Sequence, residues 1–175
     1  KPPVWRRIQV PETYTFWELH VAVQDAMGWT DCHLHEFRLV NPSTGTEGYI
    51  GILDEEEPLL SAETLAGRDQ KIAEWFSMKN CKGYYLYDFG DGWEHTVILE
   101  KTLPRDKDVK YPICVEGRRA CPPEDCGSTP GYEDICQGKH ECQEEYKDYD
   151  PEHFDPQEVY FDDPKERLKL RRDFM

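Results

Sequence analysis

Residues 83–101 alternate between large apolar and polar side chains on both sides of the tripeptide Gly90-Asp91-Gly92. This period of two around a glycine-rich turn predicts a β-hairpin. A two-residue loop would mix acidic and aromatic side chains on one face. A three-residue loop pairs Tyr87 with His95 and places the acidic and the aromatic side chains on opposite faces. We therefore expect the three-residue loop, because a buried face favours the register that keeps carboxylates off it. The predicted aromatic face holds Tyr85, Tyr87, Phe89, Trp93, His95, Val97 and Leu99.

The strongest helix signal lies just before Gly28. Thr15 followed by Glu18 has the spacing of a capping box, apolar residues then recur at helical spacing, and the glycine supplies the stop. Residues 4–10 before this helix and 34–39 after it alternate like half-buried strands. The chain is thus expected to open with a strand, a helix and a second strand.

Shorter elements follow. A third strand is expected over residues 48–53, an exposed acidic loop over 54–58, and short helices over 61–65 and around 72–76. Asp163-Pro164 begins a last helix, since proline is favoured at the first helical position. The sequence therefore predicts an α+β protein with a mixed or antiparallel sheet, a central hairpin and a short C-terminal helix.

The length of 175 residues is typical of one domain, residues 1–175. Most Leu, Ile, Val and Phe residues fall within 1–115, which we expect to form the core. Residues 116–175 are acidic, contain most of the cysteines and are poor in apolar residues. This segment is expected to wrap around the core through four anchors. These are Ile135, Phe154, Val159 and Phe161.

Charge and composition restrict the classes of function. Thirty-six acidic against 21 basic residues give a formal net charge of −15, which disfavours direct binding to nucleic acid because phosphate neutralisation needs a basic stripe. No apolar run reaches the roughly 20 residues of a membrane span. The first residues lack a signal-peptide pattern, and the seven cysteines, odd in number and mostly clustered, indicate a reducing compartment. We expect a cytoplasmic protein.

The turn of the hairpin also carries candidate catalytic residues. Asp88, Asp91, Glu94 and His95 lie within eight positions and could serve acid–base chemistry or hold a metal ion. The alternative is a structural role for these residues. Asp and Gly would then set the geometry of the turn, the aromatic residues would fill the core, and His95 would be buried with a hydroxyl partner. The three-residue loop favours this alternative because it places His95 away from Asp88 and Glu94.

A second candidate site lies among the cysteines. Cys121, Cys126, Cys136 and His140 have a spacing compatible with a tetrahedral zinc site, which would help a segment poor in apolar residues to fold. Reduced, partly buried thiols acting as small apolar residues are the alternative. His33 and His35 share one face of the predicted strand and form a third candidate pair of metal ligands. The alternative is that both are hydrogen-bonded residues near the edge of the core.

Several long motifs resemble one protein family, the plasmid pRiA4b ORF-3-like family. The resemblance rests on Tyr-Asp-Phe-Gly-Asp-Gly-Trp-Glu-His at 87–95, Arg-Ala-Cys-Pro-Pro-Glu-Asp-Cys-Gly at 119–127, and Phe-Asp-Pro at 154–156. It implies an α+β fold and an association with plasmids and insertion sequences, often under a resolvase-like label. Resolvase chemistry itself is not expected, because no serine of this chain stands among arginines.

We therefore expect a protein-binding or accessory module that is not an enzyme. Its exposed edge would be the hairpin turn and the loop 121–126, with Trp93, Glu124 and Asp125 as binding residues. Two alternatives stay open: a metal-dependent hydrolase that uses the acidic cluster of the turn, and a structural zinc protein that uses the cysteines.

Overall fold

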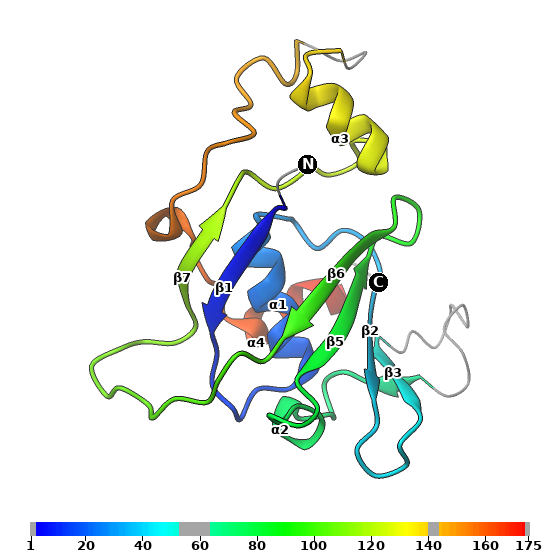
Figure 1. Ribbon diagram of the computed structural model, residues 1–175, viewed down its shortest axis with the longest axis vertical. Helices are drawn as coiled ribbons and strands as arrows, with labels where there is room; N and C mark the ends of the chain where they lie inside the picture. The colour runs from blue at the N-terminus through cyan, green and yellow to red at the C-terminus, as the bar shows by residue number, and fades with distance from the viewer. Residues whose placement is uncertain (1–2, 53–63, 140–143, 174–175) are drawn as a thin grey trace.

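The computed structural model describes residues 3–52, 64–139 and 144–173, and the side chains among them up to residue 170 (Figure 1). Its elements are β1 (Trp5–Gln9), α1 (Phe16–Met27), β2 (His35–Val40), β3 (Glu47–Gly51), β4 (Leu65–Ala66), α2 (Ile72–Trp75), β5 (Lys82–Tyr87), β6 (Trp93–Ile98), β7 (Ile113–Arg118), α3 (Ser128–Cys136), η1 (Pro156–Glu158) and α4 (Pro164–Asp173). One five-stranded sheet has the order β4-β3-β2-β5-β6, and β1 pairs with β7 in a two-stranded sheet. Among the described strands, the β3–β4 pair alone is parallel, so the larger sheet is mixed. The predicted α+β class is confirmed.

Helix α1 begins and ends where its sequence predicts. The hydroxyl of Thr15 accepts a hydrogen bond from the backbone N–H of Glu18 at 3.3 Å, and the Glu18 carboxylate accepts one from the Thr15 N–H at 2.7 Å. Gly28 ends the helix with a φ of 85° and donates its N–H to the carbonyl of Gln24. That left-handed conformation strains any residue with a Cβ, which explains the glycine.

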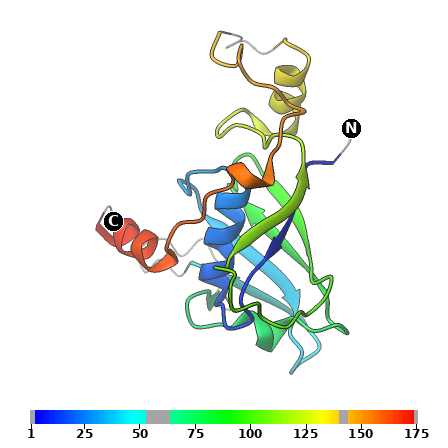
Figure 2. The ribbon, with the colours of Figure 1, turned by 90° about the vertical axis from the view of Figure 1, so that its left-hand side faces the viewer.

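The main core lies between α1 and one face of the five-stranded sheet. Phe37 and Tyr85 on neighbouring strands are fully buried, with ring centroids 4.7 Å apart. Phe16 of α1 meets Phe37 edge-on at 5.1 Å. Figure 2 shows α1 between this sheet and α4. Large buried rings thus supply the apolar area that the low content of aliphatic residues does not.

The hairpin β5–β6 has the predicted faces but not the predicted loop. Tyr87 pairs with Trp93 and Tyr85 with His95, so five residues, 88–92, connect the strands instead of three. A shift of two residues keeps each side chain of the two paired strands on its face, because the period of a strand is two. The expected pairing of Tyr87 with His95 is therefore wrong. Phe89 is also not on the aromatic face, because it lies in the turn with 40% of its surface exposed.

Asp88 explains the longer loop. Its φ of 54° turns the chain out of β5, and its Oδ1 accepts the N–H groups of Gly90 at 2.9 Å and Asp91 at 3.3 Å. Gly92, with a φ of 70°, donates its N–H to the Asp88 carbonyl. Because Asp88 caps its own turn, the loop is two residues longer than the alternating pattern predicted.

The second half of the chain contributes two elements that the sequence did not predict. Strand β7 pairs with β1 along its length, and α3 follows the loop 121–126. Tyr132 and Ile135 of α3 bury a small cluster together with Cys126. The acidic segment therefore contributes a minor core, and Ile135, expected as an anchor on the main core, lies in it.

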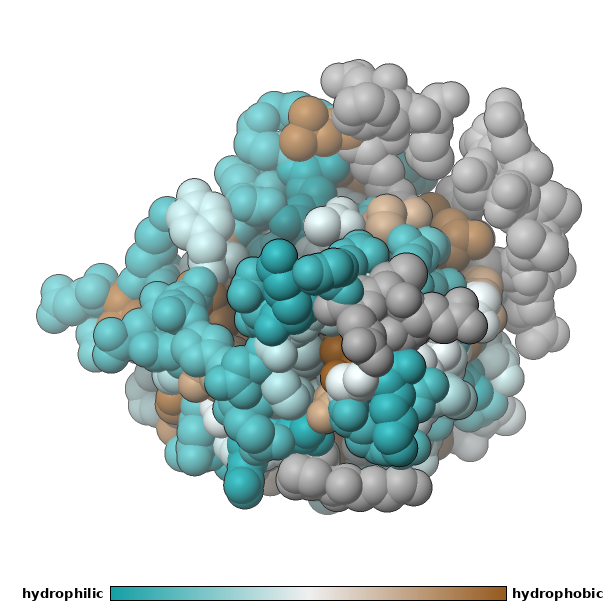
Figure 3. All heavy atoms as spheres, turned by 90° about the horizontal axis from the view of Figure 1, so that it is seen from above, coloured by the Kyte–Doolittle hydropathy of each residue, from teal (hydrophilic) through white to brown (hydrophobic). Residues whose placement is uncertain are grey.

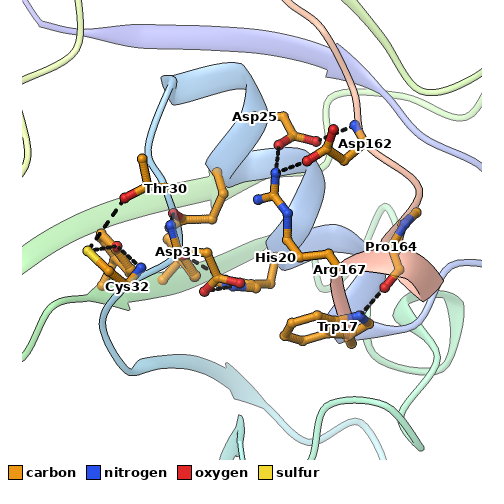
Figure 4. A network of polar contacts seen from close by, with 12 residues as sticks. Trp17, His20, Asp25, Thr30, Asp31, Cys32, Asp162, Pro164 and Arg167 are labelled. Atoms are coloured by element: carbon orange, nitrogen blue, oxygen red, sulfur yellow. Dashed lines mark hydrogen bonds and ion pairs between the residues drawn. The ribbon is translucent and has the colours of Figure 1, made fainter. Parts of the chain in front are cut away.

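The predicted C-terminal helix is present and lies against α1. Arg167 of α4 donates to Asp25 of α1 at 2.6 Å and also pairs with Asp162 (Figure 4). The indole N–H of Trp17 donates to the carbonyl of Pro164 at 2.9 Å. These contacts fix the start of α4 on the outer side of α1.

Other predictions concern residues around position 60. Leu65, expected at the end of a helix over 61–65, lies in strand β4 beside β3. Residues 61–63 and the acidic loop 54–58 lie outside the described residues.

None of the described helices combines the length and the apolar character needed to cross a bilayer. The six cysteines of the described segments carry free thiols.

Candidate functional site

Three segments far apart in the sequence meet at one end of the sheet. They are residues 29–34 after α1, the turn 87–92, and the loop 121–126, and we call their meeting place the junction. The indole N–H of Trp29 donates to the Pro122 carbonyl at 2.9 Å, and the Asp88 N–H donates to the Leu34 carbonyl at 3.0 Å. The junction is therefore held by main-chain groups as well as by side chains.

Glu124 is the central carboxylate of the junction. Its Oε1 accepts hydrogen bonds from the Thr30 N–H at 2.8 Å and from the Tyr87 hydroxyl at 3.1 Å. The Tyr87 hydroxyl in turn accepts the N–H of Cys32 at 3.2 Å. Burial, and then the charge of Glu124, raises the pKa of Tyr87 far above its ordinary value. Tyr87 is thus a neutral donor that orients the carboxylate.

His33 links the junction to the turn. Its Nε2 donates to Asp125 Oδ1 at 2.9 Å and lies 3.7 Å from Asp88 Oδ2. The other oxygen of Asp88 is engaged by the N–H groups of the turn, as described above. The side chain of Asp88 is only 11% exposed, and that of Asp125 is exposed. One imidazole therefore lies between a buried and a solvent-facing carboxylate.

Potential metal-ligand atoms gather here in two overlapping groups. In the first, one ligand atom from each of Cys32, His33 and Glu124 lies within 4.8 Å of the other two, and the second joins His33, Asp88 and Asp125 in the same way. A thiol, an imidazole and carboxylates are the ligands that zinc prefers. A third group of the described residues, composed of His20, Asp31 and His35, is buried in the core.

Comparison with known families identifies the chain. The family model described as "Plasmid pRiA4b ORF-3-like protein" matches residues 1–163. The chain belongs to this family. The uncharacterized protein y4hQ of Sinorhizobium fredii (strain NBRC 101917 / NGR234) is 37% identical over 138 residues, which are 78% of this chain and 66% of that protein. This member of the pRiA4b ORF-3-like family therefore spans just under two thirds of that relative's length.

A solved relative has the same fold. The crystal structure of MM3350, a protein of unknown function from Methanosarcina mazei Go1, superposes with a TM-score of 0.83 at 44% identity and covers 92% of each chain. The family match ends at residue 163, immediately before α4. The junction and both sheets lie within the matched range.

The four residues expected to form a catalytic cluster do not meet in this pRiA4b ORF-3-like protein. Glu94 and His95 are neighbours on β6 and point to opposite faces of the sheet. Glu94 pairs with Arg38 at 2.6 Å on the outer face, whereas His95 lies inside, edge-on to Trp29. Burial lowers the pKa of His95. Of the four, only Asp88 joins a group of potential ligands.

Asp91 has a structural contact instead. Its carbonyl accepts the hydroxyl of Ser128 at 2.6 Å, which ties the turn to the start of α3. One carboxylate oxygen of Asp91 is buried without a hydrogen-bond partner among the described residues. The negative charge of Asp91 also contributes, after burial, to raising the pKa of Cys126 to about 11.

The predicted cysteine site stays a prediction. His140 lies outside the described residues. Cys121, Cys126 and Cys136 do not form a close group of three among the residues that the structure describes. Burial raises the pKa of both Cys121 and Cys126, so these two thiols are protonated near neutral pH.

The predicted binding residues lie at or beside the junction. Glu124 and Asp125 belong to it, and Trp93 packs half-buried between the main core and the minor cluster. The histidine pair is divided, since His33 is in the junction while His35 is in the core. Cys32 was missed by sequence reasoning. The signal was the run Asp31-Cys32-His33, which begins three residues after the glycine that ends α1 and places three ligand types in one short loop.

Proposed function

We propose that this protein is an accessory binding module, associated with mobile elements, whose turn 88–92 contacts a protein partner. The observation that carries the proposal is the exposure of Phe89, 40% of whose surface is accessible at the tip of the turn. Its neighbours Tyr85 and Tyr87 on β5 are completely buried. An exposed aromatic ring on a rigid turn supports an anchor role, because aromatic residues dominate the energetics of protein interfaces.

The surroundings of Phe89 favour a basic partner. Asp88, Asp91, Glu124 and Asp125 lie in the turn and in the loop that the junction brings beside it. Within the described segments, no Lys or Arg side chain forms an ion pair with any of the four. Figure 3 views the molecule from the end that bears α3, and its surface there is mostly hydrophilic with small, separate apolar spots. A net charge of −15 adds long-range attraction for a positively charged segment.

A peptide-display selection on the immobilised protein tests this proposal. We expect enrichment of peptides that combine Lys or Arg with apolar residues. The substitution Phe89→Ala should weaken binding of an enriched peptide at least about tenfold, the size expected for an aromatic anchor. Tyr160→Ala is the matched control, since Tyr160 is 80% exposed and lies outside the turn.

The result can also reject the proposal. Enrichment of no basic peptide, or equal loss of binding in Phe89→Ala and Tyr160→Ala, overturns it. Peptide binding that falls as salt rises supports the electrostatic part of the argument, because surface attraction is screened by ions.

Metal-dependent hydrolysis is the second candidate. The observation in its favour is the convergence of Asp88, His33 and Asp125, not the four residues predicted from the sequence. Turnover of a chromogenic phosphate or acyl ester that requires added Zn²⁺ or Mn²⁺ and disappears in Asp88→Asn supports this activity. Turnover that survives both chelation and Asp88→Asn contradicts it.

A further inference from the structure

We infer that Cys32, His33 and Glu124 form a binding site for a transition-metal ion of the zinc class. The three residues supply a thiol, an imidazole and a carboxylate, and their ligand atoms lie within 4.8 Å of one another. Ligands around a tetrahedral zinc ion are about 3.3–3.8 Å apart, given bond lengths of about 2.0–2.3 Å. Small side-chain rotations therefore suffice to bring the three ligands to one ion.

The carboxylate of this site is already oriented. Glu124 is held by the N–H of Thr30 at 2.8 Å and by the hydroxyl of Tyr87 at 3.1 Å. The same hydroxyl accepts the backbone N–H of Cys32, which fixes the main chain that carries the thiol. Donors of this kind around a ligand raise metal affinity because the ligand loses less freedom on binding.

The imidazole is oriented in the same manner. Nε2 of His33 donates to Asp125 Oδ1 at 2.9 Å, with Asp88 Oδ2 at 3.7 Å. A carboxylate that accepts one ring N–H leaves the other ring nitrogen with its lone pair, the form that binds a metal. Asp88 is in turn held by the turn 88–92. Each ligand thus has a second residue that orients it.

The charge of the junction also suits a cation. Asp88, Glu124 and Asp125 form no ion pair with a Lys or Arg of the described segments, so a divalent ion would offset negative charge that no lysine or arginine of those segments offsets. Soft thiolate and imidazole ligands favour Zn²⁺ over Mg²⁺ or Ca²⁺. Three protein ligands leave a fourth position for water, as in zinc sites that act as Lewis acids.

Titration of the purified chain with Co²⁺ tests this site, because cobalt reports its ligands by absorption. We expect one equivalent to bind with d–d bands of tetrahedral cobalt and a thiolate-to-cobalt charge-transfer band. Cys32→Ser should remove the charge-transfer band, and Glu124→Gln should weaken binding at least about tenfold. Cys114→Ser is the matched control, since Cys114 is on β7 and in none of the three groups.

Cys121→Ser separates this site from the cysteine set predicted from the sequence. A charge-transfer band that survives Cys32→Ser but is lost in Cys121→Ser overturns the inference, as does the absence of Co²⁺ binding by the folded wild-type chain. Circular dichroism of each variant shows that its fold is kept. The metal site does not depend on the proposed protein partner. Phe89→Ala should therefore leave the cobalt spectrum unchanged.

Discussion

The imidazole rings of His20 and His35 stack face to face in the core, with their centroids 3.4 Å apart and their planes 8° from parallel. His20 is also hydrogen-bonded through Nε2 to Asp31 Oδ1 at 2.8 Å and through Nδ1 to the hydroxyl of Tyr85 at 2.9 Å. Gln24 completes the network, because its amide donates to the same hydroxyl at 2.8 Å and its carbonyl oxygen accepts the Asp31 N–H at 3.1 Å. A buried polar network thus joins α1, the sheet and the loop that precedes Cys32.

The hydroxyl of Tyr85 is the shared atom of this network. In Tyr85→Phe, the side chains of His20 and Gln24 each lose a buried hydrogen-bond partner. We expect a loss of about 1–3 kcal/mol in the free energy of unfolding, measured by urea denaturation. Tyr160→Phe should change stability by less than about 0.5 kcal/mol, because that hydroxyl is at the surface. Equal effects of the two substitutions would contradict the assigned contacts.

The ion pair between α1 and α4 should show strong coupling. Asp25 has a side chain only 4% exposed, and burial raises its pKa although Arg167 opposes this. Arg167→Met keeps the apolar stem but removes the charge, and should cost roughly 3 kcal/mol because a buried carboxylate loses its partner. A double-mutant cycle with Asp25→Ala measures the coupling. Additive effects of the two substitutions would show that the pair does not hold α4.

Gly83 should not tolerate a side chain. It pairs with Leu39 across the sheet, and an added Cβ would lie 2.6 Å from Leu39 Cγ. Leu39 is buried, so Gly83→Ala should reduce stability by about 1–3 kcal/mol through overpacking. In a Leu39→Ala background the same change should cost much less. Thermal unfolding of wild type, the two single variants and the double variant measures both costs. If Gly83→Ala lowered stability equally in both backgrounds, the steric explanation would be wrong.

The pH dependence of stability should reflect His95. Burial lowers the pKa of His95 in the folded state below its ordinary value of 6.5. As the pH falls through 6.5, the unfolded chain binds a proton that the folded chain does not, so stability falls until the folded pKa is reached. His95→Phe keeps the ring and should lose less stability than wild type between about pH 7.5 and 5.5 in urea titrations.

His153 provides the control of opposite sign. Its hydrogen bond to Glu158 raises the pKa of this exposed histidine, so its contribution is present at low pH and is lost as the pH rises through the folded pKa. His153→Gln should therefore not reduce the loss of stability on acidification. If His95→Phe and wild type lost stability in parallel, the buried ring would not be the titrating group.

The main chain could be predicted where its structure is local. The capping box at Thr15 and the glycine stop place α1, and Asp163-Pro164 places the start of α4. Strands β7 and β4 escaped prediction because their partners, β1 and β3, lie at a distance along the chain. The alternation around the turn sorted the faces of the hairpin correctly. It could not reveal that Asp88 caps its own turn and lengthens the loop.

The candidate site was predicted in part. Asp88, Glu124 and Asp125 were selected from the sequence, and His33 was selected as a candidate metal ligand, but paired with His35. The turn and the loop 121–126 were expected to form one exposed edge. Their actual companions, Cys32 and His33, come from a loop about 90 positions away from Glu124. Nothing in the spacing of residues along the chain encodes that approach.

By itself, the sequence determined both ends of α1 and the start of α4, which faces of the strands are apolar, and that the chain is strongly acidic. These properties follow from backbone hydrogen bonds and side-chain periodicity within a few residues. Only the tertiary structure decided the register of the hairpin, the pairing of β1 with β7 and the assembly of the junction. Such arrangements depend on how buried rings such as Trp29 and Tyr87 pack, with centroids 4.8 Å apart, and packing between distant segments leaves no local pattern in the sequence.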